Sequence, residues 1–381
     1  MTQEIGQPAD RNASLQPAQY VVAADQLPNA LQLLATDDSV ALDTEFMRES
    51  TYYPGLCLVQ AASARHCVVF DPLTIADLTP LWNFLADRAR VKVLHAARQD
   101  LEVLSQAMAP GLPIPGPIFD TQVAAGLLGL PAQIGYAGLV LARLGHELPK
   151  GLARTDWARR PLSAEQLAYA ADDVRYLARL YPGLRAELQA TSRLEWLLEA
   201  AHELEDAALY RTEPGEAWRR LKGLDRMAAR QRAAARSLAQ WRETRAMQSD
   251  KPRGWILADE TLRELAERLP ESEAELQAIR SLPASIVRKR GTDILALIAA
   301  SSAAAANEPP LTPPQRPDAA QLARVAELMS IVRTQAMQLN IAPELLATRR
   351  DVEQLVFSGH SEQLLSGWRR ALIGERLLAL L

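Results

Sequence analysis

The chain has 381 residues, 48% of them apolar, and a formal net charge of −4, which suits two or three globular domains of ordinary size. Its two cysteines exclude a disulfide-stapled scaffold and a four-cysteine zinc site. It has no run of about 18 apolar residues, so we expect no membrane span. We expect a cytoplasmic protein with buried, reduced thiols.

Residues 1–17 are polar and lack the pattern of a secretory signal, and we expect a flexible leader there. From there to residue 205 the chain alternates between strand and helix patterns. Strands are predicted at 39–46, 56–62, 66–72, 91–97 and 118–119. Helices are predicted at 78–89, 98–108, 121–130, 135–145 and 163–191. Three early strands, followed by strands that helices separate, favour a mixed five-stranded sheet covered by helices.

Beyond residue 195 every pattern is helical. The block at 211–292 holds 18 lysines and arginines against 12 aspartates and glutamates, although the whole chain is acidic. An Ala- and Pro-rich stretch at 301–318 has no apolar periodicity and indicates a linker. A second small set of helices follows at 319–381. The predicted fold class is therefore α/β plus all-α, with a domain at 18–205 followed by two helical domains.

Two acidic residues lie inside the predicted strand at 39–46. Side chains two apart on a strand share a face, so Asp43 and Glu45 project together. Two carboxylates on one buried face repel each other and lose hydration. A divalent cation relieves both effects, because hard oxygen ligands suit Mg²⁺ or Mn²⁺. The alternative is a strand end with two solvated acids.

Further along the chain, more residues extend this pattern. Asp100 lies in the first turn of the helix after the strand at 91–97, where an acid can also serve merely as a helix-dipole partner. Tyr169 and Asp173 are four residues apart and lie on one side of the helix at 163–191. Asp172 projects further toward solvent, so Asp173 is the better ligand candidate.

Three motifs resemble those of the DEDDy exonucleases: "DTEF" with "TYYPGLCLVQ", "HAARQDLEVL", and "DWARRPLSAEQLAYAADDV". Within that group they look like the ribonuclease D family. The resemblance covers roughly residues 20–190 and extends to 211–292, which resembles the helicase-and-ribonuclease-D C-terminal domain. The helices at 319–381 fit a second, more divergent copy of that domain.

The resemblance implies a ribonuclease-H-like exonuclease fold and gives roles to five residues. Asp43, Glu45, Asp100 and Asp173 match the four metal-binding acids, and Tyr169 matches the tyrosine that helps to orient the attacking water. These five are the catalytic candidates. The implied cofactors are two divalent cations, Mg²⁺ or Mn²⁺, which supply an activated water and stabilise the leaving 3′ oxygen.

Five other residues are candidates for binding the substrate. His95 ends the second-motif strand, and Phe46 and Met47 follow the first motif, where they could stack on a terminal base. Arg154 and Arg159 lie around the third motif, and arginine suits phosphate contacts. The alternative for the histidine, the phenylalanine and the methionine is a structural role in the core.

The expected activity is removal of nucleotides from an RNA 3′ end, with release of 5′-monophosphates. From the resemblance, the expected partners are tRNA precursors and other small structured RNAs with 3′ tails, bound by a monomer. The basic helical block at 211–292 would hold the RNA backbone, unless its charges only form a solvated helix face. Two rivals stay open: a 3′–5′ exonuclease that acts on DNA, and a non-catalytic RNA-binding scaffold.

Overall fold

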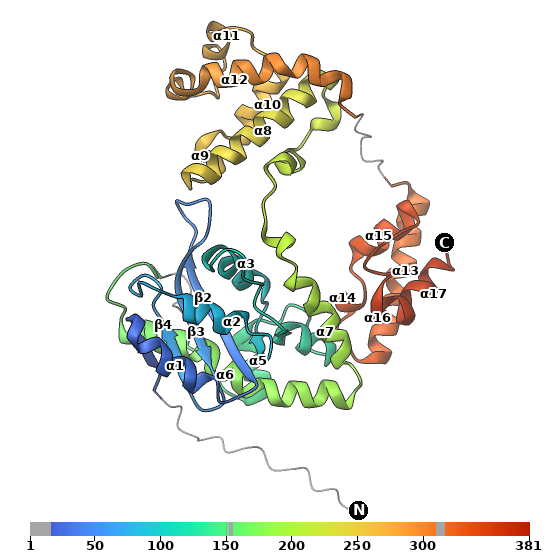
Figure 1. Cartoon of the computed structure of the whole chain (residues 1–381). Coiled ribbons are helices and arrows are strands. Elements are labelled where there is room, and N and C mark those ends of the chain that lie inside the picture. Colours follow the sequence, from blue (N-terminus) through green and yellow to red (C-terminus); the bar gives the residue numbers. More distant parts are fainter. Residues whose placement is uncertain (1–16, 150, 152–154, 310–316) are drawn as a thin grey trace, which may run out of the picture. The chain divides into compact units, whose positions relative to one another are not determined.

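The computed structural model describes residues 17–149, 151, 155–309 and 317–381. Arg154, most of the expected leader and residues 310–316 of the expected linker lie outside these ranges. The described chain divides into two compact units (Figure 1). The first unit combines the residues up to Met47 with Leu56–Ala207 and Ala320–Leu381. The second unit combines Arg48–Gly55 with Ala208–Ala319.

The first unit is built on a mixed sheet that has six strands among the described residues. The strands are β1 (Gln19–Val21), β2 (Ser39–Met47), β3 (Gly55–Ala62), β4 (Cys67–Phe70), β5 (Val91–Leu94) and β6 (Ile118–Asp120). Their order across the sheet is β1-β4-β3-β2-β5-β6. β3 and β4 pair antiparallel, whereas β1 with β4, β2 with β5, and β5 with β6 pair in parallel. The acid-bearing strand β2 is thus central.

The α/β plus all-α fold class is confirmed, but the predicted number of five strands is wrong. The additional strand, β1, is only three residues long and lies at the edge of the sheet. It pairs with β4, where Gln19 is opposite Val68, about fifty residues away in the chain. So short a segment carries no alternation of apolar and polar residues, and its pairing depends on a distant partner.

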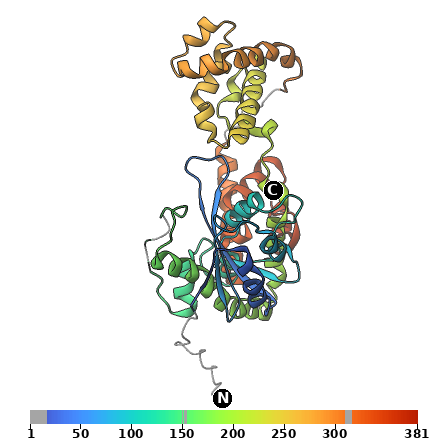
Figure 2. The same ribbon diagram turned by 60° about the vertical axis from the view of Figure 1, so that its left-hand side comes forward.

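Among the described residues up to Ala207, seven helices accompany the sheet, apart from short 3₁₀ turns. They are α1 (Leu27–Leu34), α2 (Thr79–Ala86), α3 (Arg98–Ala107), α4 (Thr121–Leu127), α5 (Tyr136–Leu144), α6 (Ala164–Ala190) and α7 (Leu194–His202). The long helix α6 packs on β2, β4 and β5 (Figure 1 and Figure 2). Its buried residues in the main core include Ala170, Ala171 and Val174. This packing brings the third motif to the sheet face from which Asp43 projects.

The start of α6 is fixed by two local devices. The Ser163 hydroxyl accepts a hydrogen bond from the Gln166 amide at 3.2 Å, and the Gln166 side chain accepts one from the Ser163 amide at 2.9 Å, which completes a capping box. Just before it, Arg160 makes a bidentate ion pair with the buried Asp71, at 2.6 and 2.7 Å. The "DWARRP" segment is therefore tied to the end of β4.

The C-terminal helices belong to the first unit, although the sequence predicts a separate domain at 319–381. They are α13 (Ala319–Leu339), α14 (Pro343–Leu346), α15 (Arg349–Ser358), α16 (Gly367–Arg369) and α17 (Glu375–Leu378). Their apolar residues share one hydrophobic core with α4, α6 and α7. Trp368 stacks on Trp196 with ring centroids 4.9 Å apart, and the Ala342 amide donates to the Gly126 carbonyl at 2.8 Å.

The second unit is a helical domain with its own core. Its helices are α8 (Ala229–Ser249), α9 (Arg253–Ile256), α10 (Asp259–Arg268), α11 (Glu273–Gln277) and α12 (Ala284–Ala304). The β2–β3 connection belongs to it, because the Tyr52 hydroxyl donates to the buried Glu243 at 2.5 Å. Helix α12 continues into a 3₁₀ turn that ends at Asn307. The Ala-rich start of the expected linker is therefore helical, as alanine favours.

Both cysteines are buried thiols that form no disulfide, as expected. None of the helices in the described part of the chain is long and apolar enough to cross a membrane.

The shared core predicts that Trp368→Ala destabilises the first unit. Trp368 is 8% exposed, and replacement of a buried tryptophan by alanine costs about 3–5 kcal/mol. We expect the thermal midpoint to fall by about 10 °C, measured by circular dichroism. Trp255→Ala is the control, because this tryptophan is 62% exposed and its loss should change the midpoint by no more than about 1 °C. Equal midpoints for the two variants would contradict a shared core.

Candidate active site

Three of the predicted acids converge. Asp43 and Glu45 project from β2, and Asp173 comes from the facing helix α6. One carboxylate oxygen of each lies within 4.8 Å of the others, a spacing that a bound metal ion could bridge. The alternation of the strand and the packing of α6 on β2 together explain why residues 130 positions apart meet here.

Asp100 lies beside this group on α3. It is 8% exposed, and its Oδ1 accepts hydrogen bonds from the Thr44 hydroxyl at 2.6 Å and the Thr44 amide at 3.1 Å. Thr44 thereby ties the acid of α3 to the strand that carries Asp43. Asp100 is also the carboxylate that raises the pKa of Asp43 most strongly.

All four acids have raised pKa values, as expected for carboxylates crowded together without a cation. Burial raises the pKa of Asp43 well above its usual range, and the neighbouring charges of Asp100, Asp173 and Glu45 raise it further. Burial is also the main cause of the raised pKa of Glu45, about 8, of Asp173, about 7, and of Asp100, about 6. After burial, the charges that raise the pKa of Asp43 most are those of three other carboxylates.

Hard divalent cations fit this donor set. Without them the acids hold protons, and with them the same oxygens become ligands, because binding favours the deprotonated form. The carboxylate oxygens, their burial and the lack of any cationic partner for Asp43 in the described chain match the preferences of Mg²⁺ and Mn²⁺.

Tyr169 is half-buried beside the acids. Burial raises the pKa of its phenol, and the charges of Asp173, Glu45 and Asp43 raise it further. The hydroxyl therefore stays protonated at neutral pH and can donate a hydrogen bond to a water molecule or a phosphate oxygen. It cannot act as a base there. Its ring lies 6.0 Å from that of the buried Trp157, centroid to centroid.

The neighbouring Asp172 lies outside the group of three converging acids, although its charge raises the pKa of Asp173. Its carboxylate pairs with Arg175 at 3.1 Å, and its backbone carbonyl accepts a hydrogen bond from Tyr136 at 2.8 Å. The sequence pattern does not single out Tyr136. Burial and the charges of Asp173 and Asp43 raise the pKa of its phenol, so it lies close to the site. Its motif, "GYAGL", carries no signal beyond a helix start.

The substrate-binding candidates differ in burial and in hydrogen bonding. Phe46 and Met47 are half-buried at the carboxyl end of β2, and Met47 packs against the main core. His95 uses both ring nitrogens within the protein, at 2.9 Å from the Thr121 hydroxyl and 3.0 Å from the Ile134 carbonyl. Arg159 is exposed.

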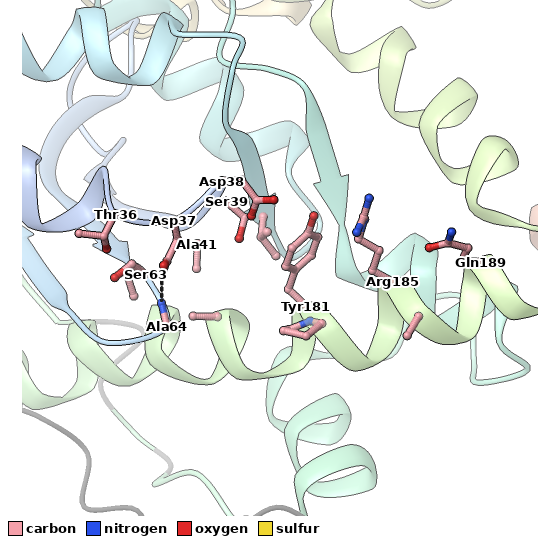
Figure 3. A pocket seen from close by; sticks show the side chains of 15 residues that line it. Thr36, Asp37, Asp38, Ser39, Ala41, Ser63, Ala64, Tyr181, Arg185 and Gln189 are labelled. Carbon is pink, nitrogen blue, oxygen red and sulfur yellow. Dashed lines mark hydrogen bonds between the residues drawn. The ribbon is translucent and has the colours of Figure 1, made fainter.

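A pocket of about 510 Å³ lies elsewhere on the first unit (Figure 3). It is lined by residues at the start of β2, such as Asp38 and Ser39, and by Tyr181 and Arg185 of α6. Asp43 and Glu45 lie further along β2, and neither they nor Asp100 and Asp173 line this pocket.

Comparison with known proteins defines the class. Residues 18–189 match the family model described as "3'-5' exonuclease", and residues 231–298 match the model of the HRDC domain. The fold and the matched segments therefore define a 3′–5′ exonuclease with an HRDC domain.

Related proteins give the family. The chain is 40% identical over 358 residues to ribonuclease D of Acidiphilium cryptum, covering 91% of this chain and 88% of the relative. It is 38% identical to that of Sphingobium indicum, over 90% and 89%. The crystal structure of Escherichia coli RNase D superposes with a TM-score of 0.85 at 31% identity, covering 96% and 98%. The chain belongs to the ribonuclease D family and is a 3′–5′ exoribonuclease.

The raised pKa values predict how pH affects the metal-free protein. The folded state binds protons more tightly than the unfolded state between about pH 4 and pH 8, because burial raises the pKa of Glu45 to about 8 and of Asp173 to about 7. Stability is therefore lost as the pH rises through this range. Asp43→Asn removes one repelling charge, so at pH 8 its thermal midpoint should exceed that of the wild type by about 2 °C or more.

The difference between the two proteins should shrink at pH 5, where the wild-type acids are largely protonated. Thermal scans in EDTA at both pH values give the comparison. A wild-type protein that is the more stable of the two at pH 8 would refute the repulsion.

Proposed function

We propose that this exoribonuclease trims the 3′ tails of small structured RNAs, tRNA precursors among them, with two divalent cations held by Asp43, Glu45, Asp100 and Asp173. The convergence of three of these acids on one partly buried spot, with the fourth beside them, is the observation that carries the proposal. The E. coli relative, described as "an exoribonuclease involved in structured RNA processing", supports the substrate class.

The mechanism follows from the four carboxylates that would serve as metal ligands. Two Mg²⁺ or Mn²⁺ ions at these acids would activate a water molecule and stabilise the leaving 3′ oxygen. The four carboxylates balance four positive charges, so the loaded site is neutral before a phosphate arrives. Thr44 keeps Asp100 against β2. The protonated Tyr169 donates a hydrogen bond that orients the attacking water or a phosphoryl oxygen.

The second unit supports binding of the RNA backbone. The block at 211–292 has an excess of basic residues, and Arg288, Lys289 and Arg290 on α12 are all exposed. A second basic feature is a pocket of about 270 Å³ whose lining includes Arg220, Lys222 and Arg263. Its acid, Asp259, already pairs with the buried Arg242 at 2.6 Å. Exposed cations around a hollow suit phosphate contacts.

The same proposal includes a monomer in the cytoplasm. All five catalytic candidates belong to one unit of one chain, so no second copy is needed to complete the site. Buried cysteines outside any disulfide suit a reducing compartment.

Asp43→Asn should abolish hydrolysis while the RNA still binds. Loss of a group that acts as part of a unit lowers kcat by about 10³-fold or more, whereas the RNA contacts of the second unit are untouched. The assay incubates a 3′-extended tRNA and a matched DNA with Mn²⁺ or Mg²⁺ and sizes the products on a gel. A filter-binding measurement runs in parallel.

The control is Asp172→Asn, an identical change one residue from Asp173 that should keep activity. EDTA should silence the wild type, and added Mn²⁺ or Mg²⁺ should restore it. Binding that falls in proportion to hydrolysis would point to misfolding, and faster cleavage of the DNA would point to a DNA exonuclease.

The basic pocket predicts a change in salt dependence. Removal of two phosphate contacts by Lys222→Gln with Arg263→Gln should lower the slope of log K against log salt by about 1.5–2. The charge-matched control is Arg324→Gln with Arg349→Gln, two arginines that pair with neighbouring glutamates on α13 and α15. If both double variants give the wild-type slope, the pocket does not bind the backbone.

A further inference from the structure

Asp120 is a buried carboxylate that the mechanism does not use. It is the last residue of β6 and is 4% exposed. Its Oδ1 accepts hydrogen bonds from the amides of Gln122, at 2.8 Å, and Val123, at 3.3 Å, and so caps the N-terminus of α4. These two contacts alone would describe an ordinary helix cap.

The same carboxylate also reaches the turn between β5 and α3. Its Oδ1 accepts from the Ala96 amide at 3.1 Å, and its Oδ2 accepts from the Ala97 amide at 2.9 Å. Ala97 is the N-cap residue of α3, and its own side chain makes no cap hydrogen bond. One carboxylate therefore serves the N-terminal ends of two helices, α3 and α4.

The turn that Asp120 holds has an unfavourable backbone conformation. Ala96 has a φ of 57°, in the left-handed region that residues with a Cβ rarely adopt. Such a conformation persists only where the surroundings determine it. The adjacent Thr121 adds a second link, because its hydroxyl donates to the Leu94 carbonyl at 3.0 Å.

The position of this turn decides where Asp100 lies. Asp100 is the third residue of α3, so a shift or rotation at Ala96 and Ala97 moves its carboxylate directly. The carboxylate of Asp100 itself accepts hydrogen bonds from Thr44 on β2. Thr44 and Asp120 thus fix Asp100 from two sides. Metal ligands tolerate little displacement, and groups that orient them affect affinity strongly.

We propose that Asp120 is a positioning residue: through the Ala96 and Ala97 amides it sets Asp100 against Asp43 and thereby determines how tightly the site binds divalent cations. The inference rests on the proposed metal-binding role of Asp100.

Asp120→Ser separates the two roles of this side chain. Serine caps a helix about as well as aspartate, so α4 keeps its cap. Its single, shorter oxygen cannot also reach Ala96 and Ala97. Asp120→Asn is a second variant. It keeps the shape of the aspartate side chain, but its NH₂ group cannot accept hydrogen bonds from the backbone N–H groups. The stability control is Thr348→Ala, which removes the side-chain cap of α15.

The measurement is calorimetric titration of the metal-free full-length protein with Mn²⁺, followed by kinetics on a 3′-extended RNA. We expect both Asp120 variants to bind Mn²⁺ about 10–100-fold more weakly. At limiting Mn²⁺, kcat should fall while KM for the RNA stays within about twofold. Thr348→Ala should keep wild-type Mn²⁺ affinity at a similar thermal midpoint.

Asp100→Asn distinguishes this inference from the proposed function. If Asp100→Asn weakens Mn²⁺ binding and both Asp120 variants bind as the wild type does, Asp120 is only a helix cap and the inference fails. If Asp100→Asn also binds Mn²⁺ normally, the proposed metal site itself is wrong. A Thr348→Ala protein that loses as much Mn²⁺ affinity as Asp120→Ser would likewise overturn the positioning role.

Discussion

Mutual repulsion among carboxylates that are partly or fully buried is the constraint on which the rest of this structure depends. One carboxylate oxygen of each of Asp43, Glu45 and Asp173 lies within 4.8 Å of the others. Asp100 adds a fourth carboxylate beside them. Left alone, such a cluster holds protons and opposes folding, because each acid loses water and faces like charges. Divalent cations turn the same repulsion into a strong and specific affinity.

Much of the first unit serves to keep these acids together against their repulsion. The central place of β2 presents two of them from a rigid strand. The capping box of α6 and the ion pair of Arg160 with Asp71 fix the helix that brings Asp173 and Tyr169. Thr44 holds Asp100 from one side, and we assign Asp120 the corresponding role on the other.

The sequence predicts the local elements well and singles out the acids as candidates, because both have local signals. Alternation and helical periodicity locate the strands β2 to β6 and the helix α6. The acids on β2 stand out because carboxylates on a buried strand repel each other and lose hydration unless a ligand compensates them. The three-residue strand β1 has no such signal, and its place depends on β4. The apolar faces of 319–381 predict helices, but an apolar face does not specify its partner, and here the partner is the core of the exonuclease domain.

The residues that sequence reasoning missed act over long distances in the chain. Thr44 bonds to an acid 56 residues away, and Asp120 bonds to amides 23 and 24 residues before it. Tyr136 reaches a carbonyl 36 residues later. None of these contacts follows from spacing or periodicity, so only the folded chain reveals them.

The most direct test is a crystal structure with Mn²⁺ and a 3′-terminal nucleotide, with the metals located by anomalous scattering. The account predicts two Mn²⁺ peaks about 3.5–4 Å apart, bound by the carboxylates of Asp43, Glu45, Asp100 and Asp173. Full occupancy of the nucleotide with no Mn²⁺ at these four acids would contradict it.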